Sequence, residues 1–192
     1  MDGMTLKQIP NIITLLRIVA IIPICWLLFR DEYMAAFVCL VLAGLSDGLD
    51  GFLARRYGWF TPLGAVLDPL ADKLFITSLI VVFAVQGHVP LWLMWLVIGR
   101  DIIIVSGALV YRWRTGSLEM KPLFISKLNT ALQILLLAAT LMHVGLYALP
   151  AEMREGLQLS VAATSLLSGM MYVFWWTYYA FMVKGEDFHC PD

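Results

Sequence analysis

Charged residues are scarce in this chain: of its 192 residues, 14% are Asp, Glu, Lys or Arg, whereas 61% are hydrophobic. Soluble domains are typically about 45–50% apolar, so a mean hydropathy of +0.83 excludes an ordinary soluble fold. The net charge of −1 gives no reason to expect a nucleic-acid partner. The composition therefore predicts a polytopic membrane protein, and the length predicts a single domain over residues 1–192.

Cysteine and histidine are also rare, with three residues of each. Cys25, Cys39 and Cys190 have neither the spacing of metal ligands nor that of a disulfide framework. No histidine has a metal-like partner in the sequence. The first ten residues mix acidic and basic side chains and lead into an apolar segment without an evident cleavage site, so we expect no removable signal peptide.

Six apolar stretches are long enough, at about 1.5 Å per helical residue, to cross a hydrocarbon core about 30 Å thick. They lie at about 11–29, 33–54, 64–86, 90–112, 122–147 and 157–183. Polar or turn-forming residues separate neighbouring stretches. The sequence thus predicts an all-α fold, a bundle of six transmembrane helices.

Lysine and arginine are distributed unevenly between the two sides of this bundle. The side with both termini has seven of them: Lys7, Arg55, Arg56, Arg112, Arg114, Lys121 and Lys184. The opposite side has only Arg30 and Arg154. The positive-inside rule therefore predicts cytosolic termini. The compact length and the lack of a transit peptide suggest a bacterial inner membrane.

Four aspartates, Asp47, Asp50, Asp68 and Asp72, lie in one segment of this apolar chain. Each carboxylate inside a bilayer boundary costs several kcal/mol before compensation, so a purely structural interpretation must explain four such costs together. Spacings of three and four residues place each pair on one helix face. Two such faces brought together would form an all-oxygen site for a hard cation such as Mg²⁺, Mn²⁺ or Ca²⁺.

Small residues accompany these acids. Gly48, Gly51, Gly64 and Ala54 would let helices approach closely and leave room for a ligand against the backbone. With Arg55 nearby, such a cavity suits a phosphate-bearing ligand, and a diphosphate in particular.

Further ionisable residues lie within the apolar stretches, including Arg17, Arg100, Asp101 and Lys127. The simplest arrangement is one polar cavity open to the cytosol, with acids on the second and third spans and bases on the first, fourth and fifth. Two alternatives are structural. Arg100 and Asp101 could pair with neighbours only to hold the fold, and Lys73 could extend its ammonium group to the membrane interface.

The aspartate segment matches, at every fixed position, the signature of the CDP-alcohol phosphatidyltransferases, D-x2-D-G-x2-A-R-x8-G-x3-D-x3-D. The matching residues are Asp47, Asp50, Gly51, Ala54, Arg55, Gly64, Asp68 and Asp72. Residues 10–17, followed by Pro23, resemble the family's first helix. Residues 67–73 resemble its glycerophospholipid branch, which includes phosphatidylglycerophosphate synthases and CMP-forming cardiolipin synthases.

This resemblance implies a six-helix membrane enzyme with a cytosolic site, which transfers a phosphatidyl group from CDP-diacylglycerol to an alcohol and releases CMP. It implies a homodimer and two bound Mg²⁺ or Mn²⁺ ions. The implied metal ligands are Asp47, Asp50, Asp68 and Asp72, and Asp72 is also the implied general base. The residues implied to bind the cytidine diphosphate are Gly51, Ala54, Arg55, Gly64, Asn11 and Thr14.

The acceptor alcohol is less well defined by the sequence. Arg17, Arg100 and Lys127 could bind its anionic group, which belongs either to phosphatidylglycerol or to glycerol 3-phosphate. Phosphatidylglycerophosphate synthases usually have Glu where this chain has Asp101, and Gly where it has Ser126. The resemblance therefore favours a cardiolipin synthase, with a phosphatidylglycerophosphate synthase as the alternative.

A divalent-cation carrier is an alternative from another class. It would need acids that reach the membrane midplane, whereas these acids lie near one face, and Gly51-x2-Ala54-Arg55 would have no purpose in it. A catalytically inactive relative would be expected to lack a motif residue, and this chain lacks none.

Overall fold

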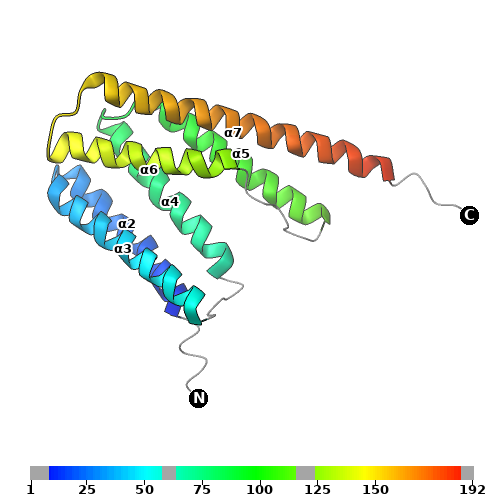
Figure 1. The fold of residues 1–192 in the computed structure, drawn as a ribbon, viewed down its shortest axis with the longest axis horizontal. Coiled ribbons are helices and arrows are strands. Elements are labelled where there is room, and N and C mark those ends of the chain that lie inside the picture. The colour runs from blue at the N-terminus through cyan, green and yellow to red at the C-terminus, as the bar shows by residue number, and fades with distance from the viewer. Residues whose placement is uncertain (1–8, 58–63, 116–123, 187–192) are drawn as a thin grey trace, which may run out of the picture. The chain divides into compact units, whose positions relative to one another are not determined.

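The computed structural model describes residues 9–57, 64–115 and 124–186, and within these ranges every regular element is an α-helix (Figure 1). The helices are α2 (Ile9–Phe29), α3 (Tyr33–Tyr57), α4 (Gly64–Val85), α5 (Leu91–Thr115), α6 (Phe124–Gly145) and α7 (Ala151–Glu186). Side chains are described for residues 14–46, 70–110 and 124–177. The predicted all-α fold is confirmed, and each predicted stretch corresponds to one helix.

Among the residues with described side chains, three helical segments are long and apolar enough to cross a membrane: Leu91–Val110, Phe124–Gly145 and Ala151–Thr177. Two further apolar helical segments, Thr14–Phe29 and Tyr33–Ser46, are shorter. The first begins at the first described side chain, Thr14, and the second stops at Ser46, after which side chains are not described. The chain is therefore an integral membrane protein. That all six helices span the bilayer, with the termini in the cytosol, stays a prediction.

Proline marks the start of two helices. Pro90 directly precedes α5 and Pro150 directly precedes α7, as expected because the residue before a helix need not donate a backbone hydrogen bond. The apolar pattern placed the start of the last helix near residue 157, yet α7 begins at Ala151. Its polar first turns include Glu152, whose negative charge is favourable beside the positive N-terminal end of the helix dipole.

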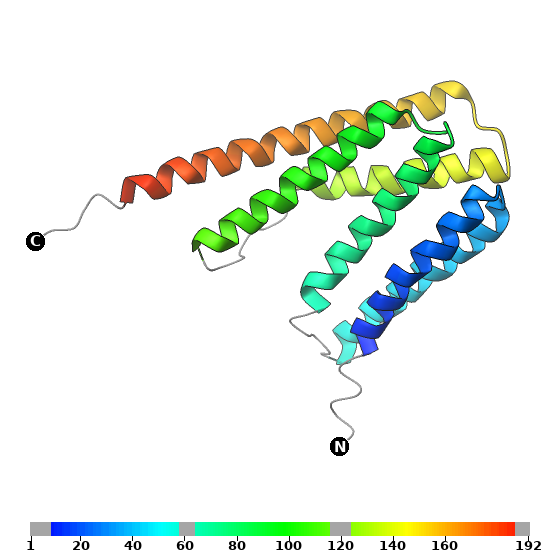
Figure 2. The ribbon, with the colours of Figure 1, turned by 180° about the vertical axis from the view of Figure 1, so that it is seen from behind.

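The helices form two compact units. Unit 1 comprises Met1–Val89 and Leu137–Pro150, and in it α2 packs against both α3 and α4 (Figures 1 and 2). Apolar side chains such as Ile24, Leu28 and Phe83 are fully buried there. Unit 1 therefore contains the helices that carry the aspartate signature.

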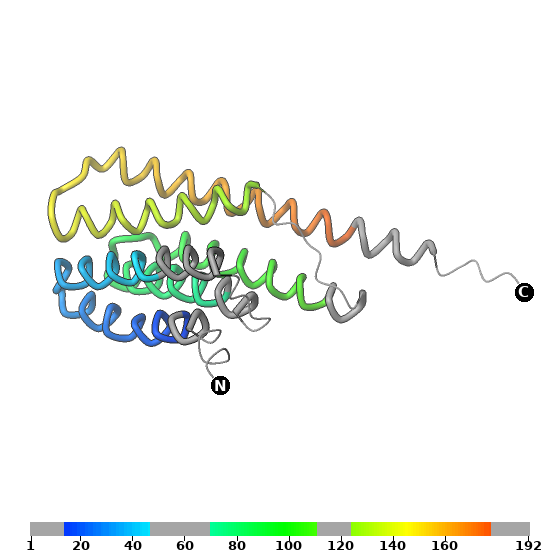
Figure 3. The backbone as a smooth tube through the Cα atoms, turned by 60° about the horizontal axis from the view of Figure 1, so that its bottom comes forward, coloured from blue at the N-terminus to red at the C-terminus, as the bar shows by residue number. Residues whose placement is uncertain are grey.

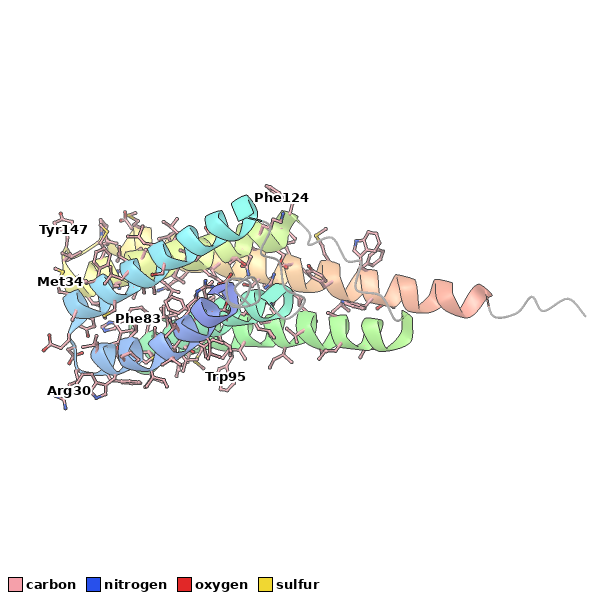
Figure 4. The ribbon with its side chains drawn as sticks, turned by 90° about the horizontal axis from the view of Figure 1, so that it is seen from below. Arg30, Met34, Phe83, Trp95, Phe124 and Tyr147 are labelled. Atoms are coloured by element: carbon pink, nitrogen blue, oxygen red, sulfur yellow. The ribbon has the colours of Figure 1, made fainter. Side chains whose placement is uncertain are left out.

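The turn between α2 and α3 lies at one end of unit 1, where Figure 4 labels Arg30 and Met34 (Figures 3 and 4). Asp31 has a positive φ of 60°, and its Oδ1 accepts a hydrogen bond of 2.6 Å from the Tyr33 hydroxyl. At the same end, a Cβ added to Gly145 would lie 2.9 Å from the Cβ of Tyr33. Only glycine permits this close approach of α6 to the start of α3.

Unit 2 comprises Pro90–Leu136 and Ala151–Asp192. In this unit α5 packs against α7, around buried side chains such as Leu93, Val97 and Val161. The small residue Gly107 on α5 allows the Trp176 ring of α7 to approach, because a Cβ at this position would lie 2.6 Å from the ring.

Candidate functional site

The aspartate signature is divided between two helices of unit 1. Asp47, Asp50, Gly51, Ala54 and Arg55 lie in α3, and Gly64, Asp68 and Asp72 lie in α4. The helical backbone confirms the spacing argument, since both aspartate pairs lie within continuous helices. The side chains of residues 47–69 lie outside the described set, so Asp72 is the signature residue whose environment is known.

Asp72 is held by an arginine from α2. The Nη1 of Arg17 donates a hydrogen bond of 2.5 Å to the Oδ1 of Asp72. The Arg17 side chain is only 9% exposed, whereas that of Asp72 is 53% exposed. The carboxylate of Asp72 therefore offsets the desolvation free energy of the nearly buried Arg17 guanidinium. The same carboxylate stays accessible to a ligand.

The other residues predicted on α2 lie close to Arg17 in the sequence. Thr14, three residues before Arg17, is buried at 2% exposure. A separation of three residues places the two on neighbouring turns of one helix face. Asn11 belongs to α2, but its side chain lies outside the described set.

The donor set of the signature suits a hard metal ion. A carboxylate offers about four lone-pair positions, so the hydrogen bond from Arg17 leaves Asp72 the capacity to coordinate a cation. Among the residues with described side chains, no group of three or more His, Cys, Asp or Glu could hold a metal ion. Asp47, Asp50 and Asp68, the other predicted ligands, are not among those residues.

A second polar cluster lies in unit 2 around Arg100 of α5, which is 5% exposed. Its Nη1 donates to the Oδ1 of Asp101 at 2.6 Å. Its Nη2 donates to the Oγ of Ser126 on α6 at 2.6 Å and to the Oγ of Ser168 on α7 at 2.8 Å. One guanidinium thus joins α5 to α6 and α7, and it also pairs with Asp101 of its own helix.

Lys127, the other base predicted to bind the acceptor, follows Ser126 on α6 and is exposed. It therefore lies one residue from a hydrogen-bond partner of Arg100. Arg100 and Lys127 thus both belong to unit 2, whereas Arg17 belongs to unit 1 and pairs with Asp72 there.

Sequence reasoning missed the polar residues of α7. Ser168 is fully buried against Arg100, and the Oδ1 of Asn129 on α6 accepts hydrogen bonds from Thr164 and Ser165, at 2.8 and 2.9 Å. These three α7 residues recur at one- and three-residue intervals within an otherwise apolar helix. Hydroxyl side chains at such spacing commonly join membrane helices, which is the signal that could have identified them.

Comparisons with known proteins agree with the signature. Residues 7–183 match the model of the family described as CDP-alcohol phosphatidyltransferase. The human protein named cardiolipin synthase (CMP-forming) is 35% identical over 149 residues, which cover 69% of this chain and 50% of that protein.

Other relatives carry a different name, CDP-diacylglycerol–glycerol-3-phosphate 3-phosphatidyltransferase. The chloroplastic protein 1 of Oryza sativa subsp. japonica is 36% identical over 153 residues, covering 71% of this chain and 46% of that protein. The Pseudomonas fluorescens protein is 47% identical over 104 residues, covering 50% of this chain and 52% of that protein. This chain thus spans about half the length of these relatives.

The cluster around Arg100 predicts a stability effect. Arg100→Lys should lower the free energy of unfolding in detergent by about 1–3 kcal/mol, because an ammonium group cannot reproduce the guanidinium fork that reaches both Ser126 and Ser168. The measurement is the unfolding transition in mixed detergent micelles.

The control is Ser106→Ala. The Ser106 hydroxyl is exposed and bonds only to the Ile103 carbonyl of its own helix, at 3.1 Å, among the contacts described. If Arg100→Lys were as stable as Ser106→Ala, the three-helix role of Arg100 would be wrong.

Proposed function

Because the chain belongs to the CDP-alcohol phosphatidyltransferase family, we propose that it transfers a phosphatidyl group from CDP-diacylglycerol to an alcohol and releases CMP. The observation that carries this proposal is the complete signature, whose last residue, Asp72, is exposed and bound by Arg17. An accessible carboxylate at a membrane site, fixed in position by a nearly buried arginine, is suited to catalysis.

The proposed metal ligands are Asp47, Asp50, Asp68 and Asp72, which would hold two Mg²⁺ or Mn²⁺ ions. Carboxylate oxygens are the ligands that such hard cations prefer. When bound, a pair of cations supplies charge neutralisation for the diphosphate and for the departing CMP.

The reaction is a single displacement at phosphorus. The acceptor hydroxyl oxygen attacks the phosphorus that bears diacylglycerol, and a new P–O bond forms. The bond from this phosphorus to the bridging oxygen breaks, and its electron pair leaves with CMP. Asp72 accepts the proton of the hydroxyl group, as a general base positioned by Arg17. The proposed residues around the cytidine diphosphate are Gly51, Ala54, Arg55, Gly64, Asn11 and Thr14.

We propose phosphatidylglycerol as the acceptor, so that the chain acts as a cardiolipin synthase; Arg17, Arg100 and Lys127 are each a candidate for binding its anionic group. The support comes from the partners of Arg100. Asp101 and Ser126 stand where phosphatidylglycerophosphate synthases usually have Glu and Gly, and both accept hydrogen bonds from Arg100. A glycine in place of Ser126 could not do so.

Glycerol 3-phosphate is the second candidate, favoured by the names of the rice and Pseudomonas relatives. Both acceptors carry a hydroxyl group and an anionic phosphate. The two candidates share the donor and the mechanism, and differ in whether the acceptor itself is a lipid.

CMP release by the purified chain with CDP-diacylglycerol and Mn²⁺ tests the function. We expect release with phosphatidylglycerol, and a loss of at least about 100-fold in Asp72→Asn, because an amide cannot accept the proton. Glu152→Gln makes the same chemical change at an exposed carboxylate of α7 and should retain activity. Release with glycerol 3-phosphate alone would contradict the acceptor assignment, and no release with any alcohol would contradict the function.

Ser126→Gly tests the acceptor assignment more closely. Losing a hydrogen bond to a charged group typically costs about 1.5–3 kcal/mol, so kcat/KM for phosphatidylglycerol should fall about tenfold or more, while the KM for CDP-diacylglycerol is unchanged. The control is Ser160→Gly, since Ser160 bonds to the Gly156 carbonyl of its own helix. Equal effects of the two variants would refute a role of Ser126 in acceptor selection.

A further inference from the structure

Two amide side chains on consecutive turns of α6 are buried in unit 2. Asn129 is 0% exposed and Gln133 is 3% exposed. Because they are four residues apart in one helix, they share a face of α6. Within the described part of the chain, neither the Nδ2 of Asn129 nor the Nε2 of Gln133 has a hydrogen-bond partner. Buried amide groups are normally hydrogen-bonded, so this pair of donors calls for an acceptor.

The orientation of the Asn129 amide is set by α7. Its Oδ1 accepts hydrogen bonds from the hydroxyl groups of Thr164 and Ser165, at 2.8 and 2.9 Å. Thr164 can also donate to the Ser160 carbonyl, at 2.8 Å. Ser165 is 0% exposed, and the Asn129 Oδ1 is its acceptor among the contacts described. Turning the amide by 180° would take this acceptor away, so the partner of the Nδ2 must be a different group.

A bound water costs less free energy than two unpaired donors. An unpaired buried donor typically lowers the equilibrium constant for folding about 5- to 150-fold, and α6 has two such donors one turn apart. Ordering one water lowers this constant about 30-fold at most, and often much less. An interior water typically makes two to four hydrogen bonds. The two amides supply two of them, and the hydroxyl oxygens of Thr164 and Ser165 have lone pairs left to accept from the water.

The charges of unit 2 favour a neutral ligand over an anion. Arg100 is a buried cation of this unit, and its guanidinium is already paired with the Asp101 carboxylate. A small anion between the two amides would therefore bring an uncompensated charge into the apolar interior, which is far more costly than burying a neutral polar molecule.

We propose that a water molecule binds between Asn129 and Gln133 and accepts hydrogen bonds from the Nδ2 and the Nε2. Asn129 lies one turn after Ser126, the residue of α6 that bonds to Arg100. The water would thus extend the polar contacts of α6 from Ser126 through Asn129 to Gln133. This inference does not depend on the proposed reaction, and its test needs no substrate.

Nuclear magnetic resonance of the full chain in detergent micelles tests the site directly. The sequence has two asparagines and four glutamines, so ¹⁵N labelling of these residues gives few side-chain NH₂ signals, which single substitutions assign. We expect cross-peaks between the water frequency and the NH₂ groups of Asn129 and Gln133. Their signs should be opposite in the laboratory and rotating frames, which distinguishes a long-lived bound water from hydrogen exchange with the solvent.

Two results of this measurement would overturn the proposal. One is a pair of NH₂ signals without a water cross-peak, as expected if the two amides bond directly to each other or to an anion. The other is cross-peaks that have only the sign of hydrogen exchange, because these would place both groups in contact with bulk solvent.

The substitution Gln133→Met provides a second test, because methionine has a similar length and no amide. If a water is bound, the variant removes one of its hydrogen bonds, and the midpoint of thermal unfolding should fall by about 2–4 °C. If the amide were unpaired, methionine would remove a costly buried donor and the midpoint would rise.

The control is Gln158→Met, the same chemical change on α7 at a side chain that is not buried, and its midpoint should be unchanged. A midpoint of Gln133→Met equal to or above that of the unaltered chain would contradict the water site. The resonance measurement uses the unaltered chain, so the proposal stays falsifiable if Gln133→Met does not fold.

Discussion

The cost of placing charge in an apolar helix bundle is the constraint on which this structure depends. An ionised group in a membrane-spanning segment must be paired, hydrogen-bonded or exposed to a polar cavity. Arg17 meets this requirement through Asp72, and Arg100 through Asp101 and two serines. The positions of these arginines therefore determine which helices must lie together within each unit.

The two clusters meet the same requirement with different consequences. Around Arg100 the guanidinium is buried and bonded to three helices, so its position is fixed. At Arg17 the base is nearly buried but the acid is half exposed. A fixed cation beside an accessible carboxylate favours ligand binding and proton transfer, which agrees with the placement of Asp72 at the end of the family signature.

The sequence predicted the helices well, because apolar runs of sufficient length have few alternatives in a membrane. It also predicted a site, from a signature of eight residues at fixed intervals. That site stays a prediction, because seven of the eight side chains lie outside the described set. It did not identify Ser126 or Ser168 as partners of Arg100, since serine is common on lipid-facing and packed surfaces alike.

Mn²⁺ binding to the full chain in detergent, followed by electron paramagnetic resonance, tests most directly whether the carboxylates of the signature form a metal site. The account predicts two ions per chain, close enough for their spins to couple, and loss of this coupling in Asp47→Asn. Tight Mn²⁺ binding that is unchanged in Asp47→Asn, or a single uncoupled ion in the unaltered chain, would contradict it.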